Sequence, residues 1–348
     1  MTRVLTYPDI DPQQWQALID RSPYATWFQT KEAYEFYASL LEEMTPFAVA
    51  IQRTNKLVAV CVGYITQAKN KLVQCFTRRA IIIGGPVIDE DATAEEITAL
   101  LNAVKKLQRS DLQPAGRSTA KRSTGLSPIY IETRNFHDYS RWKEVFQYSG
   151  FAYQPHYDIH VRCHAQHQMS ERRQRELKRA LKNGAEIIVA SSEQQIRDWY
   201  QILSQLYREK VRTPLFSEEF FLQFYRNGVG KYLLVKHDNK VIGGMMCPVL
   251  DGKAIYEWYV CGLDEEYRDL SPSVVATHAA IEYAKANGLP LFDFMGAGVP
   301  DQPYGVRDFK MEFGGELVEH GRFLCIRKPL LYKLGKWGVK WLQNSENN

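Results

Sequence analysis

Two stretches of similar form, AVAIQRTNKLVAV at residues 48–60 and YLLVKHDNKVIGG at residues 232–244, stand far apart in this chain. In each of them, two apolar runs flank a short polar segment that contains Asn-Lys, at Asn55-Lys56 and at Asn239-Lys240. Asn tolerates the left-handed conformation that a tight hairpin turn requires. Each stretch therefore predicts an antiparallel hairpin, and their likeness indicates that the chain repeats one structural unit.

The segments around the two hairpins follow the same order in both halves. The first half predicts elements at 30–43, 47–52, 57–66, 71–83, 93–108, 129–133, 139–149 and 151–161. The second half predicts elements at 193–210, 217–227, 231–237, 241–249, 254–260, 272–287, 291–295 and 317–326. Both halves give helix, strand meander, helix, strand and a late strand, although hairpins with Asn are common enough for a chance likeness. The order favours an internal duplication, with domains at 1–162 and 163–327.

Length and composition agree with two folded domains. At roughly 150 residues per domain, 348 residues correspond to about two. Hydrophobic residues make up 45% and charged residues 24%, which excludes a mostly disordered chain. The net charge of +4 is too small to indicate a nucleic-acid coat, so partners must be inferred from local features.

The cysteines and the N-terminus indicate a cytoplasmic protein. The six cysteines form no CxxC pair, and the N-terminal residues lack the apolar run of a signal peptide. Apolar stretches such as Ala80–Ile88 are too short and too interrupted to span a bilayer. The C-terminal stretch Leu330–Leu342 places Trp337 and Trp341 on an apolar stripe beside lysines. We expect this stripe to pack on the first domain, and peripheral contact with the inner face of a membrane is the alternative.

Several motifs resemble those of one enzyme family. The run Phe309–Gly315, preceded by Phe292–Gly296, resembles the closing signature of the Fem aminoacyltransferases, which build the interpeptide bridges of peptidoglycan. Trp27–Thr30 resembles their Leu-Gln-Ser/Thr segment, and Gly84–Val87 resembles their Arg-Gly-Pro-Val turn with Gly84 in place of Arg. Arg172–Ala185 resembles their Arg-rich helix. The long coiled-coil arm of some members has no counterpart.

The resemblance implies a mixed α+β fold of two tandem GNAT-like domains, each with a mainly antiparallel sheet flanked by helices. It implies that the C-terminal segment, residues 328–348, packs back on the first domain and that the second domain is catalytic. The implied reaction moves an amino acid from aminoacyl-tRNA to a peptide amine of a cell-wall precursor, by direct attack. The implied donor is a co-substrate, and neither a bound cofactor nor a metal is expected.

Lys310 and Asp293 are the catalytic candidates. An ammonium group beside the carbonyl of an acyl ester stabilises the developing oxyanion, and the family also has Phe-Lys at this place. The alternative for Lys310 is a structural lysine that pairs with Asp293 or Glu312. Asp293 is expected to orient an amine or to pair with Lys310.

Five further residues form the predicted substrate-binding set. Tyr259 lies in a strand beside the expected cleft and offers an aromatic face, with core packing as its alternative. Arg212 has a family counterpart that contacts the acceptor. Tyr304 and Arg307 lie on a Gly-rich loop and are expected to clamp a phosphate or carboxylate. Phe309 belongs to the set through the Phe-Lys motif.

The donor and the function class stay open at this point. A coenzyme A enzyme of this fold cradles pyrophosphate on a Gly-rich turn before a helix, whereas the turn here, Arg268–Ser273, contains no glycine. Ser271 and Ser273 are equally suited to cap that helix. The alternatives to aminoacyl transfer are an N-acyltransferase that moves an acyl group from coenzyme A or a carrier protein to an amino-sugar or other small amine, and a silent protein that binds a glycolipid or peptide.

Two local clusters of polar residues are expected to have no binding function. His160, Cys163, His164 and His167 have the residue types of a zinc site, but four such residues within one short stretch are more often coincidence, so no metal is predicted. The basic run 172–182 is expected to be a solvated helix, with contact to RNA or a diphosphate as the alternative.

Overall fold

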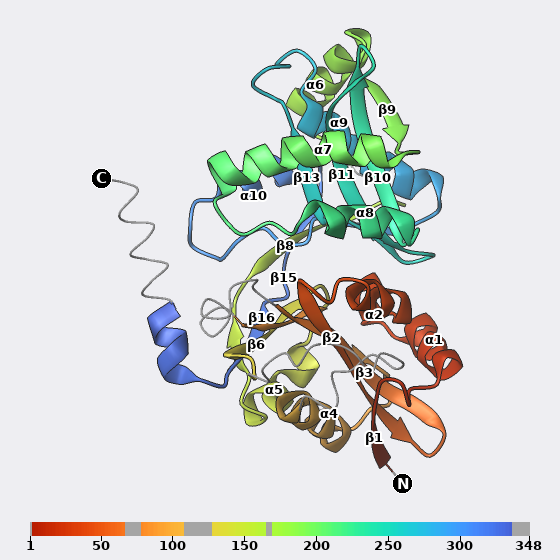
Figure 1. Ribbon diagram of the computed structural model, residues 1–348, viewed down its shortest axis with the longest axis vertical. Helices are drawn as coiled ribbons and strands as arrows, with labels where there is room; N and C mark the ends of the chain where they lie inside the picture. Colours follow the sequence, from red (N-terminus) through yellow and green to blue (C-terminus); the bar gives the residue numbers. More distant parts are fainter. Residues whose placement is uncertain (1, 67–77, 108–126, 165–168, 336–348) are drawn as a thin grey trace. The chain divides into compact units, whose positions relative to one another are not determined.

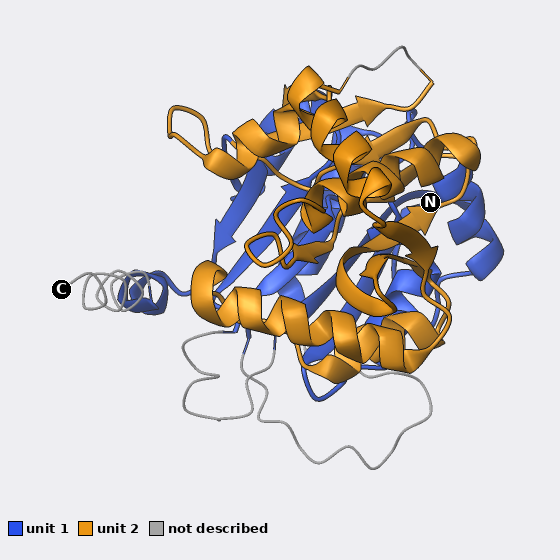
Figure 2. Cartoon of the chain, turned by 90° about the horizontal axis from the view of Figure 1, so that it is seen from above, with its two compact units in different colours: residues 1–155, 320–348 blue, residues 156–319 orange. Residues whose placement is uncertain are grey.

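The computed structural model describes residues 2–66, 78–107, 127–164 and 169–335. The chain divides into two compact units, coloured separately in Figure 2. Unit 1 contains the described residues up to Pro155 and those from His320 onward, and unit 2 is His156–Glu319. The sequence placed the boundary at 162/163. None of the described helices combines the length and the apolar character that a bilayer crossing requires.

Unit 1 is built around one mixed sheet with helices on it. Its strands, in the order β1-β2-β3-β4-β6-β16-β7 with β5 beside β3, are β1 (Thr2–Thr6), β2 (Met44–Arg53), β3 (Lys56–Thr66), β4 (Ala80–Gly84), β5 (Val87–Ile88), β6 (Tyr130–Asn135), β7 (Ala152–Gln154) and β16 (Arg322–Ile326). Its helices include α1 (Pro12–Arg21), η1 (Trp27–Gln29), α2 (Lys31–Ala38), α4 (Ala94–Lys106), η3 (Ser140–Trp142) and α5 (Lys143–Tyr148), and residues 329–335 are also helical.

Unit 2 is built in the same way (Figure 1). Its strands, in the order β15-β8-β14-β12-β11-β10-β9 with β13 beside β11, are β8 (Tyr157–Arg162), β9 (Glu186–Val189), β10 (Gly230–His237), β11 (Lys240–Leu250), β12 (Ala254–Tyr256), β13 (Tyr259–Gly262), β14 (Leu291–Asp293) and β15 (Glu316–Glu319). Its helices are α6 (Glu171–Lys182), α7 (Glu193–Leu206), the short π-helical η4 (Tyr207–Val211), α8 (Glu218–Arg226), α9 (Pro272–Ala286) and α10 (Gly305–Met311).

The two sheets share one pairing pattern. The hairpins β2–β3 and β10–β11 are antiparallel, as are the next pairs, β3–β4 and β11–β12. Each sheet then has one parallel pair, β4–β6 or β12–β14, followed by antiparallel pairs. The predicted mixed α+β fold with two similar units is therefore confirmed.

Corresponding strands are also interrupted at corresponding places. In unit 1, β4 and β5 flank Gly85-Pro86, and β5 returns to pair with β3. In unit 2, β12 and β13 flank Glu257-Trp258, and β13 returns to pair with β11. The sequence predicted a single strand over 254–260. That prediction was wrong because Glu257 and Trp258 interrupt the run. The strand before them, β12, pairs with β14, whereas the strand after them, β13, pairs with β11.

The two units exchange their late strands. The consecutive strands β7 and β8 lie in different sheets, and so do β15 and β16. The sequence predicted one strand over 151–161 and one over 317–326. Both predictions were wrong, because Pro155-His156 and His320-Gly321 separate each run into two strands, and Gly321 adopts a positive φ of 63°. The residues of β8 join unit 2, and those of β16 join unit 1.

The hairpin turns differ in detail from the expectation. In the second hairpin, Asp238 and Asn239 are left-handed, with φ of 47° and 63°. In the first hairpin, Thr54 has the positive φ, 57°, whereas Asn55 was expected to adopt it. The likeness of the hairpins therefore extends to their place in the sheet but not to the residue that makes the turn.

Both sheets carry their cores on the faces that helices cover. In unit 2, α7 and α8 cross in front of β10, β11 and β13 in the view of Figure 1, and α9 lies behind them. The core between α9 and the sheet contains fully buried side chains such as Val275 of the helix and Met245 and Phe292 of the strands. In unit 1, α4 begins with a capping box of Thr93 and Glu96 and buries Ile97 against the sheet. The side chains of 336–348, which include Trp337 and Trp341, lie outside the described residues.

Candidate functional site

Two strands of unit 2 part where the predicted catalytic residues lie. The parallel pairing of β12 with β14 ends at Tyr256 and Asp293. Beyond that point β13 pairs with β11, and the amide of Phe294 donates to Ile159 O at 3.1 Å. Glu257 and Asp293 therefore stand at the edge of the gap in strand pairing.

Five ionisable side chains are buried around this point. The exposed fractions are 3% for Asp158, 4% for His160, 6% for Glu257, 0% for Asp293 and 8% for Lys310. Asp158 and His160 come from β8, Glu257 follows β12, Asp293 ends β14 and Lys310 lies in α10. Burial of ionisable groups is costly unless they are paired, so this concentration indicates a role beyond packing.

Lys310 uses its ammonium group within this cluster. Its Nζ donates to Phe294 O at 2.8 Å and to Gly296 O at 2.9 Å, and it pairs with Glu257 Oε1 at 2.9 Å. An ammonium has three donors, so these contacts account for all of them. The expected structural partners were Asp293 and Glu312, and the structure pairs Lys310 with Glu257 instead. The oxyanion role stays a prediction, and it requires one donor to leave its present acceptor.

The two buried aspartates hold the backbone that follows β14. Asp293 Oδ1 accepts from the amide of Met295 at 2.6 Å, and Asp158 Oδ1 accepts from the amide of Gly296 at 2.7 Å. Met295 is left-handed, with φ of 56°, a conformation that is unfavourable for a side chain without a short polar group. Carboxylates and the Lys310 ammonium therefore fix a strained turn at the point where the strands part.

The charged groups of the cluster shift one another's pKa values. Burial raises the pKa of Asp158 well above its ordinary value, and the Asp293 charge raises it further. Burial acts in the same direction on Asp293, but the His160 ring and hydrogen bonds outweigh it and lower the pKa of Asp293. Burial alone would lower the pKa of His160, yet Asp293 raises it overall. Burial raises the pKa of Glu257, and Lys310 offsets only part of this effect.

Tyr304 ends the loop between β14 and α10, whereas Arg307 lies in α10 itself and not on the loop as expected. The Arg307 guanidinium donates to Ala297 O at 2.7 Å, to Gln302 O at 3.3 Å and to Val299 O at 2.5 Å, all in the loop that precedes the helix. Tyr304 packs over Gly298, where an added Cβ would collide with its ring. Both residues thus shape the loop, and the predicted clamp on a phosphate or carboxylate stays a prediction.

The other three predicted binding residues lie in separate places of unit 2. Phe309 carries the Arg173 guanidinium over its ring at 4.4 Å. Tyr259 is half-buried, with its ring 5.1 Å from that of Phe221 and 6.1 Å from that of Tyr207. Arg212 is exposed and left-handed, with φ of 54°, at the end of η4. Phe309 precedes Lys310 directly in α10, whereas Arg212 lies at the end of η4.

The helix end at the turn before α9 is capped by the side chain of Asp264, which the sequence did not predict. Asp264 accepts from the amide of Ser273 at 3.0 Å and from its hydroxyl at 2.5 Å. Ser271 is left-handed, with φ of 40°, and its hydroxyl donates to Arg268 O. Capping by Ser271 was therefore wrong, because a carboxylate from nine residues earlier caps this helix end.

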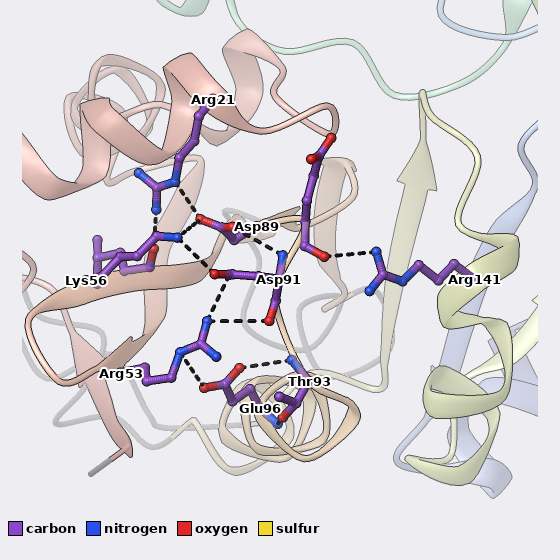
Figure 3. Close-up of polar contacts among 10 residues, drawn as sticks. Arg21, Arg53, Lys56, Asp89, Asp91, Thr93, Glu96 and Arg141 are labelled. Atoms are coloured by element: carbon purple, nitrogen blue, oxygen red, sulfur yellow. Dashed lines mark hydrogen bonds and ion pairs between the residues drawn. The ribbon is translucent and has the colours of Figure 1, made fainter.

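The corresponding turn of unit 1, before α4, is also filled by carboxylates (Figure 3). Asp89 pairs with Arg21 and Lys56, and Asp91 pairs with Lys56 and with Arg53 at 2.8 Å. Although burial alone would raise it, the hydrogen bonds from Arg21, Asp91 and Lys56 hold the pKa of Asp89 far below its ordinary value. This turn is a closed ionic network.

The basic helix α6 is largely neutralised by its neighbours. Arg173 pairs with Glu312 at 2.6 Å and with Glu176, and Arg179 approaches Asp269 at 3.5 Å. Such pairing favours the interpretation of α6 as a solvated helix, because paired arginines have less charge to offer a phosphate.

Sequence reasoning missed Asp158, Glu257 and the role of His160. The alternation of Asp158 and His160 with Ile159 and Val161 in β8 is a signal that places both polar side chains on one face. His160 entered only as part of a zinc hypothesis with Cys163, His164 and His167. In the structure the side chain near His160 is Asp293 of another strand, and His167 lies outside the described residues.

Comparisons with known proteins agree with the fold. Residues 166–311 match the family model of an acetyltransferase (GNAT) domain. Among solved structures, FemX has a TM-score of 0.69 at 15% identity, covering 95% of this chain and 99% of that one. L-PGS from Bacillus licheniformis has a TM-score of 0.56 at 12% identity, covering 94% and 96%. A tandem GNAT protein from the clavulanic acid biosynthesis pathway has a TM-score of 0.54 at 10% identity, covering 93% and 98%.

No curated protein matches the chain. The family model falls on unit 2, where the buried ionisable cluster lies. At these identities the structural likenesses establish the fold, and the family model adds the class of enzyme. The chain thus has the tandem GNAT fold that FemX also has, and the acetyltransferase (GNAT) domain in its second unit supports acyltransferase activity.

Proposed function

We propose that this chain transfers an aminoacyl group from aminoacyl-tRNA to a primary amine of a cell-wall peptide precursor. The observation that carries the choice of donor is the carboxylate of Asp264 at the start of α9. The similarity to FemX over nearly the whole chain supports the same choice. The proposed partners are the charged tRNA and the peptide amine, in the cytoplasm or at the inner face of the membrane.

Asp264 argues against coenzyme A for electrostatic reasons. A pyrophosphate at a helix N-terminus needs free backbone amides and the positive end of the helix dipole. Here the Ser273 amide is already bonded to the Asp264 carboxylate, whose negative charge also repels phosphate. Gly262 packs so closely on Ser273 that an added Cβ would collide with it, so the turn has little room to rearrange. An ester donor without a pyrophosphate at this turn avoids the conflict.

The proposed step is a direct acyl transfer. The neutral amine attacks the ester carbonyl, a C–N bond forms, and the C–O bond to the ribose breaks. The amine loses one proton and the leaving ribose oxygen gains one, so no oxidant or metal is needed. In this proposal Lys310 supplies an N–H to the oxyanion by exchanging one carbonyl acceptor, Asp293 keeps the adjacent turn in place, and Tyr259, Arg212, Tyr304, Arg307 and Phe309 contact the substrates.

A donor-consumption assay tests the proposal. The protein is incubated with cell-wall peptide precursors and either a mixture of aminoacyl-tRNAs or radiolabelled acetyl-CoA. We expect amide product with aminoacyl-tRNA and none with acetyl-CoA, and nuclease treatment of the tRNA should abolish it. Consumption of acetyl-CoA without tRNA dependence would reject the proposed donor, and the acyltransferase alternative would then stand. Consumption of neither donor would reject acyl transfer to these precursors.

The matched variant is Lys310→Ala. Loss of an oxyanion donor should lower turnover on the order of 100-fold and change KM for the donor much less. Lys178→Ala, on the exposed face of α6, is the control for loss of a positive charge on the same unit. Unchanged turnover in Lys310→Ala would remove the oxyanion role while leaving the donor assignment intact.

A further inference from the structure

The buried groups Asp158, His160 and Asp293 meet at a single point. His160 Nε2 lies 3.4 Å from Asp293 Oδ2 and 4.0 Å from Asp158 Oδ2, and these ligand-type atoms all lie within 4.8 Å of one another. Each aspartate keeps its other oxygen, Oδ1, on a backbone amide of the turn after β14. The three side chains therefore share one contact zone and grip one segment of backbone.

Charge balance limits which protonation states this group can have. With both carboxylates and Glu257 ionised, and with His160 and Lys310 positive, the five side chains would carry one net negative charge away from water. Lys310 pairs directly with Glu257 at 2.9 Å, and its charge is the smallest of the causes that act on the pKa of Asp158. One additional proton makes the group neutral, and two carboxyl groups that share a site tend to hold one proton between them.

The local contacts indicate where that proton lies. Asp293 Oδ2 lies 3.4 Å from His160 Nε2, and this proximity favours the charged form of Asp293, whose negative charge in turn favours protonation of Asp158. Asp158 can donate only from Oδ2, because its Oδ1 accepts from the amides of Ile159 and Gly296 at 2.7 Å each. The surrounding charged groups are Glu257 after β12, Lys310 in α10 and Arg162 on β8, and they do not change this order.

We propose that Asp158, His160 and Asp293 form a positioning triad for the turn Phe294–Gly296, in which Asp158 is the neutral acid, Asp293 the carboxylate and His160 the imidazolium. The Asp158 proton is donated to Asp293, and Asp293 also holds the His160 ring. Through the two Oδ1 atoms, the triad keeps Met295 in its left-handed conformation at the parting of the strands. The triad acts on the proposed reaction through this turn, so its catalytic effect rests on the proposed function.

Isosteric variants distinguish this distribution of protons from one in which Asp158 is the charged carboxylate. Asn at position 158 reproduces a neutral acid, because its oxygen accepts the two backbone amides and its NH₂ donates to Asp293. Asn at position 293 removes the charge that holds the His160 imidazolium. We therefore expect Asp158→Asn to keep the wild-type behaviour, whereas Asp293→Asn and Asp158→Ala lose it.

The first readout needs no substrate. The imidazole of His160 is followed by NMR in the full-length protein as the pH is raised, with His160→Gln used to assign its signal. We expect the ring to stay protonated to higher pH than a free histidine in the wild type and in Asp158→Asn, and to titrate at lower pH in Asp293→Asn. A neutral ring at pH 6 in the wild type would overturn the proposal.

The second readout addresses a metal ion, the other occupant that these residues could hold. The divalent-cation content of the purified full-length protein is measured by mass spectrometry before and after dialysis against a chelator. Stoichiometric metal that is lost in Asp158→Asn would overturn the proposal, because an amide is a poor substitute for a ligating carboxylate. Metal-free wild-type protein with a protonated His160 supports it.

Kinetics complete the test once transfer is observed. Asp158→Asn should stay within about 3-fold of the wild-type kcat, and Asp293→Asn should lose on the order of 10-fold or more in kcat with little change in KM. Equal losses in both variants would contradict a neutral Asp158. If no donor is consumed, the proposed function fails, and the NMR and metal measurements still decide the triad.

Discussion

Strands β6 and β14 occupy corresponding positions in the two sheets, but their ends are held by different chemistry. In unit 1, Thr133 donates to Asn135 Oδ1 at 2.8 Å, and Asn135 Nδ2 donates to His320 O at 3.0 Å. The neighbouring strand interruption is held by Tyr139, whose hydroxyl contacts Gly84 O at 3.2 Å and Pro86 O at 2.7 Å. In unit 2, the same places are held by carboxylates, an imidazole and an ammonium.

The contrast shows that the fold does not require buried charge at this position. Unit 1 fixes the same strand end and the same interruption with neutral hydrogen bonds, which cost much less to bury. The ionic contacts of β6, which join Glu132 to Arg134 and Arg322, leave the two guanidinium side chains 36% and 26% exposed. The buried charges of unit 2 are therefore explained better by chemistry than by stability, in agreement with the match of the GNAT model to this unit.

The sharpest way to test this contrast is to remove one ionic partner from each unit. Lys310→Met leaves Glu257 buried without its cation and should lower the free energy of unfolding by about 3–5 kcal/mol. Arg322→Met leaves Glu132 with Arg134 and solvent, and should cost about 1 kcal/mol or less. Urea unfolding of both variants gives the comparison, and similar losses would contradict the distinction between the units.

Removal of the neutral counterpart should have an intermediate effect. Tyr139→Phe deletes the hydroxyl that serves two backbone carbonyls and leaves them buried, so we expect a loss of about 2 kcal/mol in unfolding free energy. The aromatic ring stays in place, which keeps the packing against Phe146. Urea unfolding measures the loss, and a value near that of Lys310→Met would show that unit 1 depends on this site as strongly as unit 2.

The two units should also respond differently to pH. The folded state raises the pKa of His160, so its contribution to stability is complete below the unfolded pKa of about 6.5 and is lost as the pH rises through the folded value. Each unit of pKa increase corresponds to about 1.4 kcal/mol. Urea unfolding between pH 6 and pH 9 should show this decline in the wild type and not in His160→Gln. An identical decline in the variant would assign it to other groups.

The smallest expected effects concern the left-handed residues Thr54 in unit 1 and Met295 in unit 2. Glycine relieves the backbone strain of the folded state but increases the conformational entropy of the unfolded chain. Each change to Gly should therefore raise the free energy of unfolding by about 0.5 kcal/mol or less. We expect Thr54→Gly to leave transfer unaffected, whereas Met295→Gly should lower turnover because it relaxes the turn beside Lys310. Thermal unfolding and the donor-consumption assay measure the two effects. Unchanged turnover in Met295→Gly would show that the turn need not be rigid.

Much of the fold could be predicted from local sequence patterns. The site could be predicted only in part, because its residues are far apart in the sequence and come together only in the folded chain. The two hairpins and the order of elements gave the repeated architecture, because apolar periodicity and turn residues are local signals. Lys310 and Asp293 were found through the family motif. Glu257 was missed because the sequence placed it inside an ordinary strand, 254–260, and it becomes notable only when α10 brings Lys310 to it.

The strand exchange was missed for a related reason. The runs 151–161 and 317–326 both have the composition of strands, and nothing local says that each of them serves two sheets. Gly321 was a weak signal of a break, since glycine inside a strand often marks a bend or bulge. The whole fold determines which neighbouring strand a given strand pairs with, and the local sequence of that strand does not carry this information.

The exchanged strands also determine the order in which the two sheets can be completed on the ribosome. Unit 2 is one continuous segment, His156–Glu319, so all of its strands are available once that segment has emerged. Unit 1 is begun first, yet β16, which lies between β6 and β7, is synthesised after every strand of unit 2. Until then β6 and β7 each lack a neighbour, and exposed edges of this kind invite pairing with other chains. The half of the protein that is made first is therefore the half whose sheet can be completed last.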